Sequence, residues 1–273
     1  MSTASPAAEP IAFIGGGQMA LALVEGFTAA SLVAADAITV YDPVPAARER
    51  LASRVAGLRF AESAAEAAGA ADLVWLAVKP QQAAAACADI KPVMADRTLV
   101  SIAAGLSTGL LSALTGTQRV VRVMPNTPCL VGHGVSVFCR TEAVTAAAAR
   151  RVQNLLAAVG HVHDADEAML DAVTGVSGSG PGFLALIVEA LADGGVKAGL
   201  PRPLALALAV QTMAGTGLLL ERTGDHPAVV KDKVSSPGGT TIAGLAVLEE
   251  RGVRGAMIDA VAAATTRARE LGG

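Results

Sequence analysis

A glycine-rich turn between a short apolar strand and a helix is the feature that most constrains how this chain folds. The predicted strand Ile11–Ile14 runs directly into Gly15–Ala20, a segment that fits the pattern G-x-G-x-x-A. Gly15 permits a tight turn, Gly17 leaves the backbone open to close approach by a ligand, and Ala20 lets helix and strand pack tightly. Such a turn connects a buried strand to a helix, so we expect a layered α/β sheet.

Short apolar runs and alanine-rich helical patterns alternate over roughly the first 160 residues. The apolar runs are mostly unbroken, which is typical of parallel strands covered by helices on both faces. Segments Met19–Ala30 and Pro45–Val55 are expected to be two of these helices. The pattern predicts an α/β, Rossmann-like domain with a doubly wound, mostly parallel sheet. The candidate strands are Ile11–Ile14, Ile38–Tyr41, Leu73–Val78, Leu99–Ile102 and Val120–Val123.

The pattern changes after His161–Asp164, and no convincing strand follows from Glu167 onward. We therefore place a domain boundary near residue 164, which gives a Rossmann-like domain over 1–164 and an all-α domain over 165–273. Glycine and proline residues separate the helical segments of the second domain. These predicted helices are Pro181–Ala198, Pro201–Leu220, Thr241–Arg251 and Val253–Leu271.

Composition narrows the possible partners and the cellular setting. The net charge is −3 with no run of like charges, which argues against nucleic acid or an anionic membrane surface as a partner. No unbroken apolar run reaches the roughly 18 residues that span a bilayer, and the N-terminus lacks the pattern of a signal peptide. Cys87, Cys129 and Cys139 form no C-x-x-C pair. We expect free, partly buried thiols in a reducing compartment, and hence a cytoplasmic protein.

Asp42 stands at the end of the second predicted strand. In dinucleotide-binding sheets an acidic side chain here accepts hydrogen bonds from the adenosine ribose, which favours a nucleotide site over a bare tight connection. A carboxylate also repels a 2′-phosphate, so the pattern leans towards NADH. The alternative is a solvated turn residue before Pro43, and Arg48 and Arg50 lie near enough along the chain to reach a phosphate. The cofactor is therefore NADPH or NADH, with the choice open.

Two further segments fall at the carboxyl ends of predicted strands, where such sheets bind ligands. Val78-Lys79-Pro80 ends the strand predicted at Leu73–Val78. Lys79 is placed to approach the nicotinamide ribose, and the alternative is an ordinary surface lysine. Residues 103–105, Ala-Ala-Gly, follow the next strand. Their small side chains leave room for the nicotinamide or serve tight packing alone.

The helical domain contains one candidate anion site. Residues 235–241, Ser-Ser-Pro-Gly-Gly-Thr-Thr, precede the predicted helix Ile242–Arg251. The two glycines let the backbone turn sharply, and a helix N-terminus with unpaired N–H groups is a natural receptor for a carboxylate. The alternative is an ordinary capped helix start. A second run of small residues, 177–182, stands at the start of the long helix that continues from Phe183. It is either a cap and close-packing device or part of the same pocket.

Other arrangements of reactive side chains are weaker. His161 and His163 alternate along a short candidate strand, but no third ligand stands at a suitable spacing, so no metal site is expected. His133 and His226 fall in turns without a serine or cysteine nucleophile motif nearby.

Together these segments resemble pyrroline-5-carboxylate reductase. The resemblance covers nearly the whole chain after residue 10, and its most specific parts are residues 78–80, 124–128, 175–181 and 236–241. It implies reduction of (S)-1-pyrroline-5-carboxylate to L-proline by NADPH or NADH, the last step of proline biosynthesis. It also implies that the helical domain pairs with a second copy to form a homodimer, which frequently assembles into a ring of dimers.

The resemblance, taken with the reasoning above, assigns roles to individual residues. Thr241 is the candidate catalytic residue, because its hydroxyl would hydrogen-bond the ring nitrogen of the imine. The expected substrate-binding residues are Glu167, Ser236, Gly238, Gly239, Thr240 and Thr241. The expected cofactor-binding residues are Ile14, Gly15, Gly16, Gly17, Gln18, Met19, Asp42, Val78, Lys79, Pro80 and Ala104.

Two rival functions start from the same fold. One is a related Rossmann-plus-helices oxidoreductase that acts on a hydroxy acid or on another imine. A hydroxy-acid enzyme needs a lysine or histidine to handle the alcohol proton, and the loop 235–241 offers neither. The other is a dinucleotide-sensing module without catalysis, which would bind cofactor but turn over no imine. Fold alone does not separate these functions, because function depends on the site.

Overall fold

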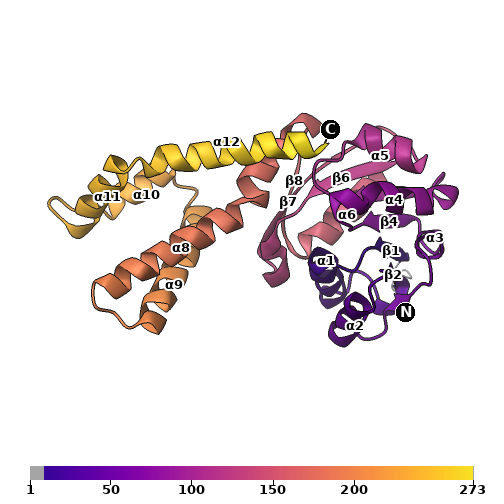
Figure 1. Ribbon diagram of the computed structural model, residues 1–273, viewed down its shortest axis with the longest axis horizontal. Coiled ribbons are helices and arrows are strands. Elements are labelled where there is room, and N and C mark those ends of the chain that lie inside the picture. The colour runs from indigo at the N-terminus through magenta and orange to yellow at the C-terminus, as the bar shows by residue number, and fades with distance from the viewer. Residues whose placement is uncertain (1–8, 273) are drawn as a thin grey trace, which may run out of the picture. The chain divides into compact units, whose positions relative to one another are not determined.

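An eight-stranded sheet forms the N-terminal part of the molecule in the computed structural model, which describes residues 9–272 (Figure 1). The strand order is β3-β2-β1-β4-β5-β6-β7-β8, so the sheet reverses its direction of winding between β1 and β4. The strands are β1 Ile11–Ile14, β2 Ile38–Tyr41, β3 Arg59–Phe60, β4 Leu73–Leu76, β5 Thr98–Ser101, β6 Val120–Met124, β7 Gly134–Arg140 and β8 Gly160–Asp164. The predicted α/β, Rossmann-like class is confirmed.

Side chains of each central strand alternate between two apolar layers, which explains the unbroken apolar runs in the sequence. Ile11 and Phe13 of β1 belong to one core cluster, while Ala12 and Ile14 belong to the other. Helices α1 Gln18–Ala29, α2 Pro45–Arg54 and α6 Ala146–Ala157 supply the first cluster. Helices α3 Ala64–Gly69, α4 Pro80–Ile90 and α5 Thr108–Thr115 supply the second. The sheet is thus covered on both faces, as a doubly wound fold requires.

The far half of the sheet departs from the five predicted strands. β7 pairs antiparallel with β6, with Arg122 opposite Cys139, and β8 pairs parallel with β7. A short helical turn, residues 127–131, reverses the chain after β6 and makes the antiparallel return possible. β8 contains His161 and His163, which were expected on a short strand. β3 is a strand of two residues at the opposite edge of the sheet. The sheet is therefore mostly parallel with one antiparallel pair.

Residues 179–262 form a second compact unit built only of helices, whereas the described residues up to Gly178 and from Ala263 onward form the first. The second unit holds α8 Gly180–Lys197, α9 Arg202–Thr223, α10 Pro227–Lys233, α11 Thr240–Glu250 and the first part of α12 Val253–Gly272. The four helices predicted here are present. Helix α10, which was not predicted, begins at a proline and is capped by the ring of His226, whose Nδ1 accepts a hydrogen bond from Ala228 N.

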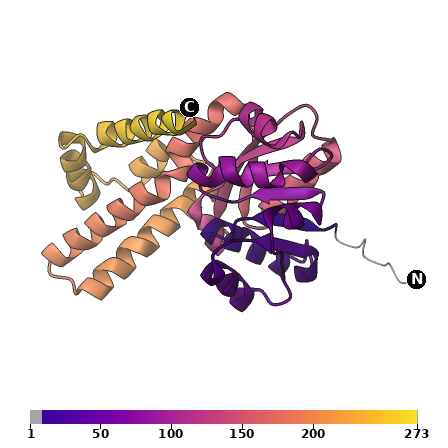
Figure 2. The same ribbon diagram turned by 45° about the vertical axis from the view of Figure 1, so that its right-hand side comes forward.

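Helices α8 and α9 lie side by side as an antiparallel hairpin in both views (Figures 1 and 2). Small residues allow this close approach, because Gly195 of α8 faces the methyl group of Ala205 in α9. Ala192, Ala205 and Ala209 form the buried contact of this unit. Alanine and glycine therefore form the packed contact between these two helices, whereas larger apolar side chains form the packed contacts of the sheet.

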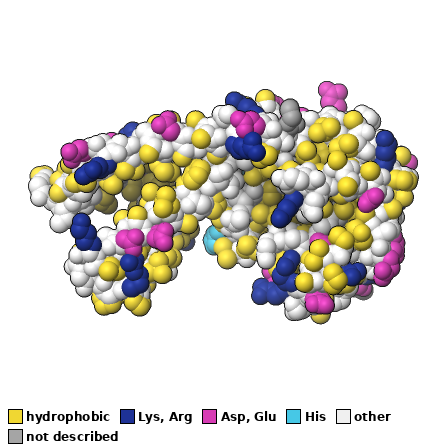
Figure 3. Space-filling model, viewed as in Figure 1, with side chains coloured by type: hydrophobic (Ala, Val, Ile, Leu, Met, Phe, Trp, Pro, Cys, Tyr) yellow, Lys and Arg dark blue, Asp and Glu magenta, His cyan; other side chains and the backbone are white. Residues whose placement is uncertain are grey.

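Most other apolar side chains of the hairpin are exposed, and hydrophobic atoms are spread along its visible face (Figure 3). Leu186 is 64% exposed on α8, and Leu206 and Leu208 are 46% and 50% exposed on α9. By length and composition alone, the helical stretches 167–197 and 202–223 are long and apolar enough to cross a membrane, and few of their residues are buried. Neither stretch is an unbroken apolar run, because polar residues interrupt both. An exposed apolar surface of this kind marks an interaction site.

An aromatic cluster lies in the core of the first unit. Trp75 of β4 is fully buried and stacks on Phe13, with ring centroids 5.6 Å apart, while Phe27 of α1 packs on both rings. The indole Nε1 of Trp75 has no hydrogen-bond partner among the described residues. Apolar packing against the two phenylalanines therefore holds this ring in place without help from its polar atom.

The three cysteines are free and buried, as the sequence predicted. Burial disfavours the thiolate and raises the pKa of Cys87 and of Cys139 to about 11, with the nearby Glu167 carboxylate adding to the effect at Cys139. A thiol with that pKa is ionised on the order of once in a thousand molecules at pH 8, so we expect slow native labelling by thiol reagents and fast labelling after unfolding.

The raised thiol pKa values predict a loss of stability at high pH. Below about pH 8.5 both states keep these protons, but above it the unfolded thiols ionise while the folded ones do not. Stability should therefore fall as the pH rises from 9 towards 11, by on the order of 1 kcal/mol per pH unit for each thiol. Urea unfolding of the wild type and of the Cys87→Ala/Cys139→Ala variant measures this. Equal slopes for the two proteins would contradict it.

Candidate functional site

The glycine turn after β1 is held by two close backbone contacts. Gly15 donates a hydrogen bond from its N–H to the carbonyl of Tyr41, at 2.8 Å, which ties the turn to β2. Its φ is +102°, and an added Cβ would lie 2.7 Å from the carbonyl oxygen of Ala77, just past β4. A side chain is excluded here both by the left-handed backbone and by β4. Gly15 therefore lets β1 and β4 come together where the sheet reverses.

The backbone of the next residue, Gly16, is held at both its N–H and its carbonyl group. The N–H of Gly16 donates to Asp42 Oδ2 at 2.7 Å, and Arg50 Nη2 donates to the carbonyl oxygen of Gly16 at 2.9 Å. Asp42 also accepts from the N–H of Val44 through Oδ1, at 2.8 Å. The Nε atom of Arg50 is buried and has no partner among the described residues. Asp42, which the sequence predicts to lie at the ribose, thus holds the backbone of the glycine turn in this structure.

Gly17 presents open space instead of a contact. It is the N-cap of α1, and an added Cβ would meet no heavy atom within 4 Å. A helix N-terminus without a side-chain cap offers backbone N–H groups and a favourable dipole to an anion. Open space beside these donors lets an anion approach them, so the residues of this loop suit the pyrophosphate of a dinucleotide.

The remaining predicted cofactor residues lie at the same edge of the sheet. Strand β4 lies between β1 and β5, with Leu76 paired to Ile14 on one side and to Ser101 on the other. The loops that follow these strands therefore lie next to each other at the carboxyl edge, at the point where ligands bind in such sheets. They carry Gly15, Gly16, Gly17, Val78, Lys79, Pro80 and Ala104, beside Gln18 and Met19 of α1.

Local structure explains how the β4 and β5 loops present their residues. Lys79 is exposed at the N-cap of α4, and Pro80 is the first residue of that helix, where its missing N–H is not needed. After β5, Ala104 precedes Gly105, whose φ of +83° turns the chain towards α5. Each loop leads into a helix whose N-terminus lies at the same edge of the sheet as the N-terminus of α1.

The candidate substrate loop lies in the second unit. Gly238 has a φ of +68°, and the N–H of Gly239 donates to the carbonyl of Ser236 at 3.0 Å, which closes a tight turn before α11. Helix α11 begins at Thr240, with Gly239 as a cap that has no side chain to use. Among the described residues, the hydroxyls of Ser236, Thr240 and Thr241 have no hydrogen-bond partner. The loop thus combines uncapped N–H groups with three available hydroxyls.

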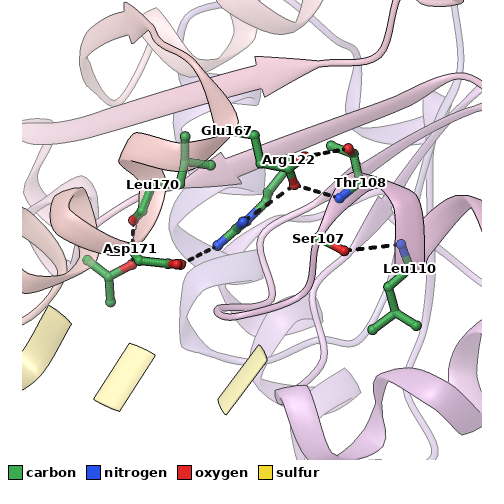
Figure 4. Close-up of polar contacts among 8 residues, drawn as sticks. Ser107, Thr108, Leu110, Arg122, Glu167, Leu170 and Asp171 are labelled. Atoms are coloured by element: carbon green, nitrogen blue, oxygen red, sulfur yellow. Dashed lines mark hydrogen bonds and ion pairs between the residues drawn. The ribbon is translucent and has the colours of Figure 1, made fainter. Parts of the chain in front are cut away.

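Glu167, the remaining expected substrate residue, belongs to the first unit and has partners there (Figure 4). Its Oε1 accepts from the N–H of Thr108 at 2.6 Å, and its Oε2 accepts from the hydroxyl of Thr108 at 2.7 Å. Oε1 also lies 3.4 Å from Arg122 Nη1. The predicted substrate residues are therefore divided between a carboxylate in the first unit and a loop in the second.

Comparison with known proteins decides the family. A family model described as pyrroline-5-carboxylate reductase dimerisation matches residues 167–271, and one described as NADP oxidoreductase coenzyme F420-dependent matches residues 10–105. A pyrroline-5-carboxylate reductase of Synechocystis sp. is 43% identical over 262 residues, which cover 96% of this chain and 98% of the relative. The chain belongs to the pyrroline-5-carboxylate reductase family. The resemblance seen in the sequence motifs is confirmed.

Other pyrroline-5-carboxylate reductases agree over the same span. The Pisum sativum enzyme is 41% identical over 262 residues, covering 96% of this chain and 95% of that one. The crystal structure of a Plasmodium falciparum pyrroline carboxylate reductase with NADP bound superposes with a TM-score of 0.89 at 32% identity, covering 98% of this chain and all of that chain. The likeness includes both units, which places the helical region within the family fold. The rival functions drawn from the fold alone are not favoured.

Sequence reasoning did not identify four residues that support these loops. Arg50, which bonds the Gly16 carbonyl, was considered only as a phosphate ligand. Arg122, Thr108 and Asp171, the partners around Glu167, were not singled out. A usable signal existed for Arg122, because a single charge within the apolar run Val120–Val123 has to find a buried partner.

The contrast between Gly15 and Gly17 yields a test of the phosphate site. Gly17→Ala should keep the melting temperature within a degree or two, because its Cβ meets only open space, yet weaken cofactor binding at least about tenfold by blocking the phosphate. Gly15→Ala should lower stability itself, by on the order of 1–3 kcal/mol, because of backbone strain and the contact with Ala77. Thermal unfolding and fluorescence titration with NADPH and NADH measure both. Normal cofactor affinity in Gly17→Ala would show that the phosphates bind elsewhere.

Proposed function

We propose that this chain reduces (S)-1-pyrroline-5-carboxylate to L-proline with NADPH or NADH as the hydride donor, the last step of proline biosynthesis. The identity of 43% with a pyrroline-5-carboxylate reductase over 96% of the chain carries this proposal. Two features of the structure support it: the turn after β1 and the turn before α11 each lead into a helix start without a side-chain cap.

Residues of the glycine turn and of the β4 and β5 loops would hold the cofactor. Backbone N–H groups at the start of α1 would bind the pyrophosphate, Lys79 would approach the nicotinamide ribose, and Ala104 would leave room for the nicotinamide. When bound, the nicotinamide supplies the hydride that the imine carbon accepts. Asp42 would face the adenosine ribose, where its charge disfavours a 2′-phosphate, so we expect NADH to serve at least as well as NADPH.

The turn before α11 would hold the substrate. Backbone N–H groups of Gly238 and Thr240, with the hydroxyl of Ser236, would receive the carboxylate, because a helix N-terminus favours a negative charge. Thr241 then lies beside the ring nitrogen. The turn contains neither histidine nor a carboxylic acid, so the nitrogen arrives already protonated and becomes the amine once hydride reaches carbon. The protein contributes alignment, which is worth on the order of 7–11 kcal/mol of barrier in favourable cases.

The helical region would also pair two copies of the chain. The exposed leucines of α8 and α9 form an apolar surface that water disfavours, and residues 167–271 match a dimerisation model. We propose a homodimer, with a ring of dimers as its larger form, and a substrate-binding and dimerising domain over 165–273. Free buried thiols suit a cytoplasmic location.

The assay is oxidation of NADPH or NADH, followed with and without pyrroline-5-carboxylate. We expect oxidation only when the imine is present, and no turnover with either cofactor by a folded protein would overturn the proposed function.

Thr241→Ala should then lower kcat between a few-fold and roughly a hundredfold, because it removes a hydrogen bond that forms to the reacting nitrogen.

Thr241→Ser is the matched control for this prediction, because it keeps the hydroxyl and loses only the methyl group. Its kcat should stay within about threefold of wild type. If Thr241 only supports the start of α11, the alanine variant will lose about 1 kcal/mol of stability and keep its kcat. Such a result would leave the backbone N–H groups as the main substrate anchor.

Dimer formation is tested by charges placed on the exposed apolar surface. Leu186→Glu and Leu206→Glu each put a carboxylate where a second copy would cover it, so we expect monomers by light scattering at micromolar concentration. Leu32→Glu is the matched control, since Leu32 is 40% exposed on the first unit. A wild-type monomer, or dimers in both helical variants, would contradict the proposed assembly.

A further inference from the structure

Arg122 carries a positive charge into the interior of the sheet. It lies in β6, is only 6% exposed and pairs across the strands with Cys139 of β7. A buried guanidinium is costly unless oppositely charged groups and hydrogen bonds surround it. Arg122 Nη2 lies 2.9 Å from Asp171 Oδ1, and Nη1 lies 3.4 Å from Glu167 Oε1. The charge is therefore balanced by two carboxylates.

Both carboxylates come from one short stretch of chain. Glu167 and Asp171 are four residues apart in consecutive helical turns, so they fall on the same side of that stretch. The stretch continues into a wide helical turn at residues 174–178, which directly precedes the second unit in the chain. Arg122 thus ties residues 167–171 to strand β6 of the sheet.

Glu167 extends this network to α5. Its two carboxylate oxygens accept the N–H and the hydroxyl of Thr108, the first residue of α5, in addition to the contact with Arg122 (Figure 4). A carboxylate at a helix N-terminus is favoured by the unpaired N–H groups and the helix dipole. Ser107 caps the same turn separately, because its hydroxyl accepts from Leu110 N at 3.2 Å. Glu167 is therefore a cap supplied from a distant part of the sequence.

The network controls the loop between β5 and α5. Residue Ile102 at the start of this loop donates from its N–H to Leu76 of β4 at 3.1 Å, and Thr108 at its end is held by Glu167. Between them lie Ala104 and Gly105, which the proposed function places beside the nicotinamide. Both ends of the loop are therefore fixed, one by the sheet and one by a side chain from residue 167.

We propose that Glu167 is a positioning residue: with Arg122 behind it, its bond to Thr108 sets the β5–α5 loop that lies along the nicotinamide. This differs from the expectation that Glu167 binds the substrate, and it rests on the proposed function. All three oxygen–donor contacts of its carboxylate are made within the first unit. A loop held at both ends keeps the nicotinamide within the narrow range of positions that hydride transfer requires.

The proposal predicts that Glu167 and Thr108 act as one unit in catalysis. Glu167→Gln removes the charge and leaves Arg122 paired with Asp171, while Thr108→Val removes the hydroxyl at nearly constant volume. Each should lower kcat about tenfold with KM for the imine changed less than about twofold. The double variant should be no slower than the slower single variant, because both remove the same interaction. Thr108→Ser, which keeps the hydroxyl, should have nearly the kcat of wild type.

A second readout does not depend on turnover. Hydrogen exchange of the cofactor-free protein should become about tenfold faster at residues 102–110 in Glu167→Gln and in Thr108→Val, and stay unchanged at residues 15–20. Thr145→Ala is the matched control, since it removes a hydroxyl that caps α6 by accepting from Ala148 N at 3.2 Å, outside the β5–α5 loop and without contact to Glu167. It should lower the melting temperature and leave kcat and the effect of Glu167→Gln unaltered.

The outcomes separate this proposal from the proposed function. If wild type reduces no imine, the proposed function fails, while the exchange experiment still tests the coupling of Glu167 to the loop. A raised KM with normal kcat in Glu167→Gln, together with a Thr108→Val variant like wild type, would make Glu167 a substrate ligand and overturn the positioning role. Unchanged exchange at residues 102–110 in both variants would overturn it as well.

Discussion

The close approach of two backbones at Gly15 is the constraint on which the arrangement of this site depends. β1 and β4 are neighbours in the sheet although they are separated in sequence, and the carbonyl of Ala77 occupies the place that a side chain at residue 15 would need. Because the strand order reverses here, the loops after β1, β4 and β5 share one edge. The uncapped start of α1, the exposed Lys79 and the Ala104 loop therefore all lie at this edge.

Two kinds of constraint act on the two units. The first unit buries its apolar side chains within itself, and it uses paired charges such as Arg122 and Glu167 to fix loops that have no regular structure. The second unit buries mainly alanines and leaves large apolar side chains such as Leu186 outside. These side chains stay exposed in a single copy of the chain. A second copy would cover them, and the match of residues 167–271 to a dimerisation model agrees with that need.

Much of the fold was predictable because its determinants are local. β1, the glycine turn and α1 are specified by neighbouring residues, and so are the long helices between glycine and proline breaks. Strand β7 was missed because Gly134–Arg140 mixes polar and apolar residues and depends on β6 for its pairing. The contact between Arg122 and Glu167 was missed for the same reason: the two residues are 45 apart in sequence, and only the folded sheet brings them together.

The fully buried indole of Trp75 also determines what light can report about this protein. It is the single tryptophan of the chain, and it lies in the sheet of the first unit against Phe13 and Phe27. Intrinsic emission therefore follows the packing of the sheet and says almost nothing of the helical hairpin, whereas far-ultraviolet circular dichroism is dominated by helices. Denaturation curves recorded by the two methods would coincide only if both units unfold as one cooperative system. Spectroscopy of the unmodified chain can thus count its independently folding parts.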